Sequence, residues 1–199
     1  MTLKRHLASL TICSLMVFGP TLALTESAGI GCVKAVDVFL AAPTDQRLRV
    51  LSRIDRTGCW TMFAQSNAKL GQLNRLAVSG NRVSAQYLAA HLNQLDGGNL
   101  EDSLRAMGEF SEHDMEHFLL FARKGLLSNR ELADALTMLP LSLSDNPLGQ
   151  LHSLRLRKSK VSAVRRKDLS DQTARALTAI NEFESEIKSK SPKISEDQT

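Results

Sequence analysis

Residues 32–59 read CVKAVDVFLAAPTDQRLRVLSRIDRTGC, two apolar-striped segments joined by Ala42-Pro43-Thr44, with a cysteine at each end. Apolar residues recur at helical spacing in both segments. The proline ends the first helix and the threonine can cap the second, so we expect a helical hairpin. In an antiparallel hairpin the start of the first helix meets the end of the second. This arrangement brings Cys32 and Cys59 together and predicts a disulfide.

The predicted bridge closes a 28-residue loop, which stabilises the fold by about 3–4 kcal/mol in the chain-entropy model. The two cysteines are not in Cys-x-x-Cys spacing, which indicates a structural bridge rather than a catalytic one. The alternative is a pair of unpaired buried thiols at Cys32 and Cys59. The remaining cysteine, Cys13, lies in a segment that we interpret as an export signal.

The first residues have the three parts of a secretory signal peptide. Lys4-Arg5-His6 is positively charged, and Leu7–Phe18 is mostly apolar and too short to span a bilayer. Thr21 and Ala23 then supply small residues at the two positions that a signal peptidase reads. We therefore predict a signal over residues 1–23, cleaved after Ala23, with Thr25 as the alternative. Export places the mature chain in an oxidising compartment, where disulfides persist. The chain has no Asn-x-Ser/Thr sequon, which favours the bacterial periplasm.

The mature chain is long enough for one domain with its own core. We expect a single helical domain over residues 24–190 and a polar, disordered tail over 191–199. Without Lys4 and Arg5, the 25 Lys+Arg fall to 23 against 21 Asp+Glu, so the mature net charge is +2. The isoelectric point of the whole sequence, about 9.1, therefore overstates the basicity of the mature protein.

The fold class predicted for the chain is all-α. No segment alternates apolar and polar residues long enough to make a strand, and connections of two to five residues favour antiparallel neighbours. We expect a compact bundle of about eight to nine short helices with one disulfide, stacked helix pairs being the alternative. After residue 59 one helix runs unbroken from Met62 to Ala77. The expected boundaries of the later helices are Gly80, Gly97-Gly98, Ser111, Gly125, the capping box Ser128–Glu131, Asn146-Pro147 and Ser170.

One short motif has the composition of a metal site. His113 and His117 are four residues apart and therefore lie on one face of the helix expected after Ser111, where they could share a metal ion with Glu116 beside them as a base. The order His-x-x-Glu-His resembles the signature of inverzincin (pitrilysin-type) peptidases, which implies that the histidines bind zinc and that Glu116 is the general base. The resemblance also implies a downstream glutamate ligand, for which the candidates are Glu182, Glu184 and Glu186. The interpretation that we favour is a polar flank of a surface helix.

Charge is divided between an acidic stretch, residues 96–116, and a basic stretch of thirteen residues, 155–167. We favour a solvated face that complements the acidic stretch within the fold. The alternative is a site for an acidic protein partner or an anionic membrane surface. The basic stretch holds no aromatic residue for base stacking, so we expect no nucleic acid. The basic residues are Arg155, Arg157, Lys158, Lys160, Arg165, Arg166 and Lys167.

Two functional hypotheses follow. The first is a periplasmic, non-enzymatic helical binding protein that acts through a protein partner in the cell envelope and needs no cofactor. An immunity protein that neutralises a toxin is one concrete version, by analogy of size, compartment and architecture. The second is a small zinc-dependent hydrolase that uses His113, Glu116 and His117.

Overall fold

The computed structural model of the chain describes residues 23–55 and 59–191, and over these residues it is helical with no strand. The predicted all-α class is therefore confirmed. The α-helices are α1 (Ala23–Ala41), α2 (Asp45–Asp55), α3 (Cys59–Ala64), α4 (Asn67–Val78), α5 (Arg82–Ala89), α6 (Gly97–His113), α7 (Met115–Arg123), α8 (Asn129–Thr137), α9 (Pro147–Ala163) and α10 (Ser170–Lys190). Short 3₁₀ turns lie at Leu92–Gln94, Leu141–Leu143 and Lys167–Leu169.

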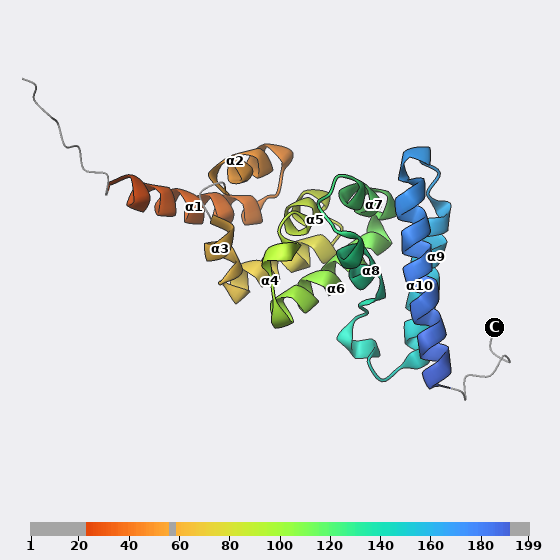
Figure 1. The fold of residues 1–199 in the computed structure, drawn as a ribbon. Coiled ribbons are helices and arrows are strands. Elements are labelled where there is room, and N and C mark those ends of the chain that lie inside the picture. Colours follow the sequence, from red (N-terminus) through yellow and green to blue (C-terminus); the bar gives the residue numbers. More distant parts are fainter. Residues whose placement is uncertain (1–22, 56–58, 192–199) are drawn as a thin grey trace, which may run out of the picture.

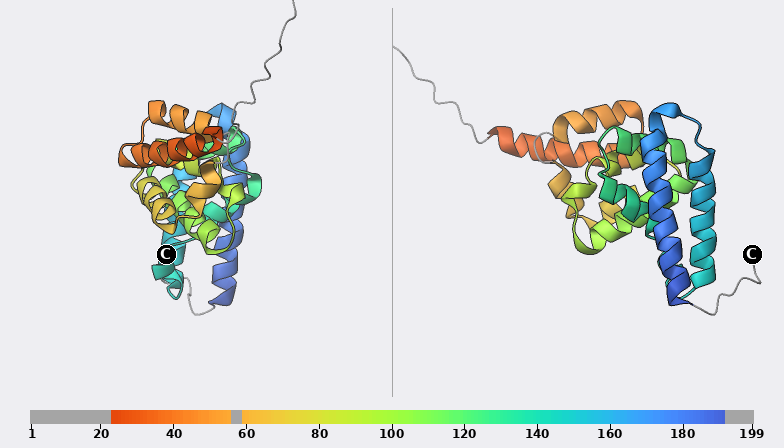
Figure 2. Two further views of the ribbon diagram at one scale, coloured as in Figure 1. Left: turned by 90° about the vertical axis from the view of Figure 1, so that its left-hand side faces the viewer. Right: turned by 45° about the vertical axis from the view of Figure 1, so that its right-hand side comes forward.

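The helices follow the chain from one end of the molecule to the other (Figure 1). Helices α1 to α3 form one end, α4 to α8 form the middle, and α9 and α10 form an antiparallel pair at the other end. The two helices of this pair pack against each other, and α9 lies on the outer side in the right-hand view of Figure 2. The apolar stripes expected from the sequence face inward, because Phe39, Leu88, Phe110 and Phe118 are all fully buried.

The predicted disulfide is present. Cys32 and Cys59 are bridged, with their Cα atoms 5.6 Å apart. Helix α1 begins nine residues before Cys32, so the bridge leaves α1 from its middle and reaches the first residue of α3. The bridge adjoins Trp60, whose ring stacks on His91 with centroids 4.3 Å apart. Trp60 also packs edge-on against Tyr87 of α5, with centroids 5.4 Å apart, so the disulfide joins α1 to the aromatic contact between α3 and α5.

Two predicted helix starts are confirmed by their capping bonds. The Ser128 hydroxyl accepts from the Glu131 amide at 3.2 Å, and the Glu131 carboxylate accepts from the Ser128 amide at 2.6 Å. Asn146 caps α9 through its side-chain oxygen, with proline in the first turn. Ser170 makes no cap bond and is the first helical residue of α10, so that predicted cap was wrong.

Other predicted boundaries were also wrong. The helix expected from Met62 to Ala77 is two helices, because the chain is extended at Ser66, the N-cap of α4. The break expected at Ser111 is absent, because its hydroxyl is buried and donates to the carbonyl of Gly108 at 2.6 Å instead of capping. Helix α6 therefore continues to His113, and the break comes at the next residue.

The predicted signal peptide lies outside the described residues except for Ala23, with which α1 begins. Most of the predicted tail, residues 192–199, also lies outside them. Among the helices that the structure describes, none is long and apolar enough to cross a membrane.

Candidate binding surface

The His-x-x-Glu-His motif does not lie on one helix. Asp114 ends α6 and caps α7, where its carboxylate accepts from the His117 amide at 3.1 Å. His113 is consequently the last residue of α6, and His117 belongs to the first turn of α7. The single helix face that placed both imidazoles beside one metal ion was a wrong expectation, because a strong N-cap residue stands between them.

Each residue of the motif contacts other parts of the fold. His113 packs against Gly80, whose φ of +84° suits glycine alone at this turn. His117 Nδ1 lies 2.8 Å from the Asp114 carboxylate, and its Nε2 lies 3.3 Å from Arg82. Glu116 pairs with Arg166 at 3.1 Å. The contacts of His117 and Glu116 therefore join α7 to Arg82 of α5 and to Arg166 in the connection between α9 and α10.

The downstream glutamates are on α10 and face different surroundings. Glu184 is buried and accepts from Lys158 at 3.3 Å, while Glu186 pairs with Lys190 on its own helix. Glu182 lines a groove beside α8. Within residues 23–55 and 59–191, no three His, Cys, Asp or Glu side chains are grouped so as to hold a metal ion. The zinc hypothesis therefore lacks the geometry on which it was based.

The structure divides the basic stretch into one buried cation, cations in ion pairs, and cations without an ion pair, of which Arg165 donates to the carbonyl of Ser162 at 2.7 Å. Arg157 has no exposed surface. Its Nε donates to Glu112 at 2.8 Å, and its Nη1 donates to the carbonyls of Leu136 at 2.9 Å and Ala135 at 3.2 Å. A third carbonyl, that of Met138, lies 3.3 Å from the same Nη1. Arg157 thus caps the C-terminus of α8 from α9, so it is not part of the surface on which we expected it.

Electrostatics around Arg157 follow from its burial. Loss of water lowers the pKa of the guanidinium, and the carboxylate of Glu112 opposes this effect. Burial also raises the pKa of the nearby Glu109 carboxyl, with the like charge of Glu112 as the second cause. The acidic and basic stretches therefore meet inside the fold at this point, whereas the favoured interpretation expected a solvated face at Arg157.

Two further cations of the stretch are engaged within the molecule. Lys158 pairs with Glu184 of α10. Arg166 donates to Asp168 at 2.7 Å and to Glu116 of α7 at 3.1 Å, and these hydrogen bonds raise its pKa and lower that of Asp168. Glu116 belongs to α7, whereas Arg166 and Asp168 belong to the connection between α9 and α10. Arg166 therefore holds this connection against α7.

The other four cations are Arg155, Lys160, Arg165 and Lys167. None of them forms an ion pair with any residue that the structure describes. Arg155 is exposed and Lys160 is half-buried on the solvent-facing side of α9, and Arg165 and Lys167 are exposed in the connection that follows it. Leu148 and Leu156, at 49% and 42% exposed, share that side of the helix. We call these six residues the α9 surface.

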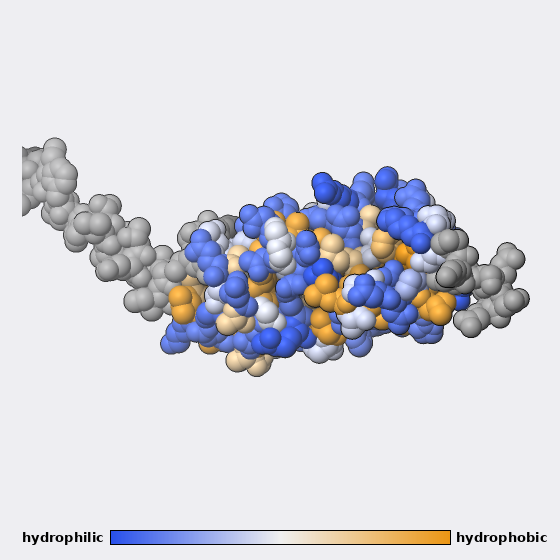
Figure 3. Space-filling view, turned by 90° about the horizontal axis from the view of Figure 1, so that it is seen from below, coloured by the Kyte–Doolittle hydropathy of each residue, from blue (hydrophilic) through white to orange (hydrophobic). Residues whose placement is uncertain are grey.

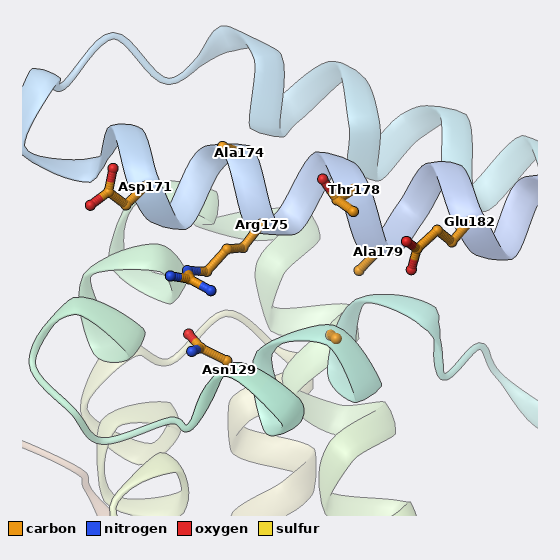
Figure 4. A pocket seen from close by; sticks show the side chains of 8 residues that line it. Asn129, Asp171, Ala174, Arg175, Thr178, Ala179 and Glu182 are labelled. Carbon is orange, nitrogen blue, oxygen red and sulfur yellow. The ribbon is translucent and has the colours of Figure 1, made fainter.

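Two hollows adjoin α10. The larger, about 550 Å³, lies between α8 and α10 and is shown in Figure 4. The smaller, about 350 Å³, lies between Phe183 and the loop that holds Leu141, which is 66% exposed. Its charged residues, Arg105 and Asp134, are paired with neighbours on their own helices. Seen from below, the molecule is mostly hydrophilic with scattered hydrophobic patches (Figure 3).

Sequence reasoning missed both hollows, because each needs two elements that are far apart in the chain. A signal for the larger one was present: Asp171, Arg175, Thr178 and Glu182 recur at helical spacing and leave one side of α10 without a large apolar residue. A scan against protein-family models finds no match for the chain, and searches of curated proteins and of solved structures also find none.

Proposed function

We propose that the protein is an exported, non-enzymatic helical binding protein that acts through a protein partner in the cell envelope. The observation that carries this proposal is the α9 surface, in which four unpaired cations and two exposed leucines lie on and just after one helix. Elsewhere in the same basic stretch the cations are paired or buried. A surface that keeps its positive charge unneutralised attracts an acidic partner, and exposed leucines supply apolar contact area.

The disulfide and the predicted signal support an oxidising compartment for this activity. Neutralisation of an envelope-targeting toxin, as an immunity protein does it, is the concrete version that we propose. Long-range attraction of an acidic partner accelerates association and weakens with salt. We therefore expect the affinity for the partner to fall as the salt concentration rises.

The test begins with capture of partners from the envelope fraction of the native host, using the mature protein with its disulfide intact. A stoichiometric partner is then purified and its Kd measured at low and moderate salt. The key variant reverses all four cations of the α9 surface to glutamate. We expect it to bind at least about tenfold more weakly at low salt, since each rim charge contributes modestly.

A matched control carries the same change of charge at exposed cations on other helices, Lys34, Arg49, Arg53 and Lys188. Equal affinity of the α9 variant and the control would remove the α9 surface from the site. A toxin among the stoichiometric partners, inhibited by the wild-type protein and not by the α9 variant, would support the immunity version.

A further inference from the structure

The groove between α8 and α10 has a floor of small side chains and a border of charged ones. Ala133 of α8 faces Ala179 and Thr178 of α10 across it. Asp171, Arg175 and Glu182 line the α10 side and Asn129 the α8 side. Figure 4 shows Arg175 and Asn129 pointing toward one another across one end of the groove. The groove is open along its length rather than enclosed.

The charges that line this groove are not neutralised within the molecule. Asp171, Arg175 and Glu182 form no ion pair with any residue in the described part of the chain. The spacing of Asp171 and Arg175 permits an ion pair along the helix, yet Arg175 extends across the groove instead. Lys158, Arg166 and Lys190, which lie on or near the same helix pair, each have a carboxylate partner.

We propose that this groove is a docking site for one amphipathic helix of a protein partner. The small side chains of the groove floor, Ala133, Thr178 and Ala179, allow a third helix to approach α8 and α10 closely. Its side chains would then pack into the groove, as ridges pack into grooves between helices. The charges run negative, positive, negative along α10, over eleven residues or about 16 Å of helix. The complementary helix carries a positive, a negative and a positive residue at the matching heights.

This inference shares with the proposed function only the premise that the partner is a protein. The groove lies between α8 and α10, whereas the α9 surface lies on the outer side of α9. A small ligand would find an open groove with little enclosure, unlike the concave pockets in which such ligands bind. A helix could lie along the whole open groove and pair its own charges with Asp171, Arg175 and Glu182.

The probes are designed 18-residue helical peptides with an alanine-rich face. One pair carries Lys-Glu-Lys at positions i, i+4 and i+11 or, for the opposite orientation, at i, i+7 and i+11. The second pair has Glu-Lys-Glu at the same positions. Binding to the ¹⁵N-labelled protein is followed by NMR titration. We expect one Lys-Glu-Lys peptide to bind about tenfold more tightly than its charge-swapped counterpart, with amide shifts confined to α8 and α10.

The decisive variant swaps the charges of the groove by Asp171→Lys, Arg175→Glu and Glu182→Lys. The preference should reverse, so that the Glu-Lys-Glu peptide binds more tightly. Thr178→Trp, which fills the groove from an exposed position, should abolish binding of both peptides. Asn181→Trp is the control, because this residue is exposed on α10 and does not line the groove.

A preference that does not reverse, or shifts that lie outside the groove, would overturn the proposal. Self-association that Thr178→Trp abolishes would assign the groove to a second copy of the chain and would also overturn it. The α9 charge-reversal variant should bind the peptides like the wild type. Loss of peptide binding therefore leaves the proposed α9 surface standing, and loss of α9-dependent partner binding leaves the groove standing.

Discussion

The Nε of Arg157 donates a hydrogen bond to Oε1 of Glu112 at 2.8 Å, and the arginine in this pair has no exposed surface. The pair joins α9 to α6, while the Nη1 of the same guanidinium binds the carbonyls that end α8. The Arg157 guanidinium therefore neutralises the Glu112 carboxylate and also bonds to carbonyls in the last turn of α8. In this way it links α6, α8 and α9. Burial makes this arrangement sensitive to the loss of either member.

Arg157→Met should lower the free energy of unfolding by about 3 kcal/mol or more, because it removes the cation that neutralises Glu112 and the donor that satisfies the α8 carbonyls. Chemical denaturation followed by circular dichroism measures the change. Lys160→Met is the matched control on the same helix, because Lys160 forms no ion pair with any described residue and its loss should cost about 0.5 kcal/mol or less. Similar losses in the two variants would contradict the interior role of Arg157.

Gly108→Ala should destabilise the protein by about 2 kcal/mol, because overpacking forces neighbours to move. A Cβ at this position would meet the carbonyl of Ala135, a backbone atom, and would lie 2.9 Å from Nη1 of Arg157. Gly71→Ala is the control within α4, where the nearest atom is 3.6 Å away. It should leave stability unchanged or raise it by up to about 1 kcal/mol, since alanine favours helix. Thermal denaturation compares the two.

Replacing both cysteines, Cys32→Ser with Cys59→Ser, should lower the free energy of unfolding by about 3–4 kcal/mol, because the open chain has more conformational entropy when unfolded. The fluorescence of Trp60, the single tryptophan, reports the transition from beside the bridge. A reducing agent should shift the urea midpoint of the wild type and leave that of the double variant in place. A wild-type midpoint that reduction does not move would mean that the bridge contributes no stability.

Glu109→Gln should stabilise the protein at neutral pH and have no such effect in acid. Burial, followed by the charge of Glu112, raises the pKa of Glu109 above its ordinary value of 4.5. A carboxyl with a raised folded-state pKa binds protons more readily when folded, so it costs stability as pH rises through and above that range. Denaturation midpoints of wild type and variant should converge below pH 4.5. A difference that stays constant with pH would contradict this origin.

Protein purified without a histidine tag should contain no stoichiometric zinc, because Asp114 separates the two histidines of the His-x-x-Glu-His motif into different helices. Metal analysis of the wild type and of His113→Ala measures this directly. One zinc per chain that disappears in His113→Ala would revive the hydrolase hypothesis. His152→Ala is the control, since this exposed histidine lies on α9, away from the motif.

The sequence by itself determined the helical class, the disulfide and the helix starts at Ser128 and Asn146. These features depend on local rules: apolar spacing, proline and glycine breaks, and side chains that bond to backbone amides within one turn. Boundary errors arose where two local signals competed. Ser111 and Asp114 are both good N-caps, and burial of the Ser111 hydroxyl against the Gly108 carbonyl decided in favour of Asp114.

Only the tertiary structure decided which charged side chains are exposed to a binding partner. Arg155 and Arg157 are two residues apart and identical in type, yet one is exposed and the other is wholly buried. The difference comes from the rotation of α9 against α6 and α8, which turns one side chain inward to the end of α8. The groove between α8 and α10 is likewise a property of two packed helices. Its walls are more than thirty residues apart in the chain, so no local pattern could place them together.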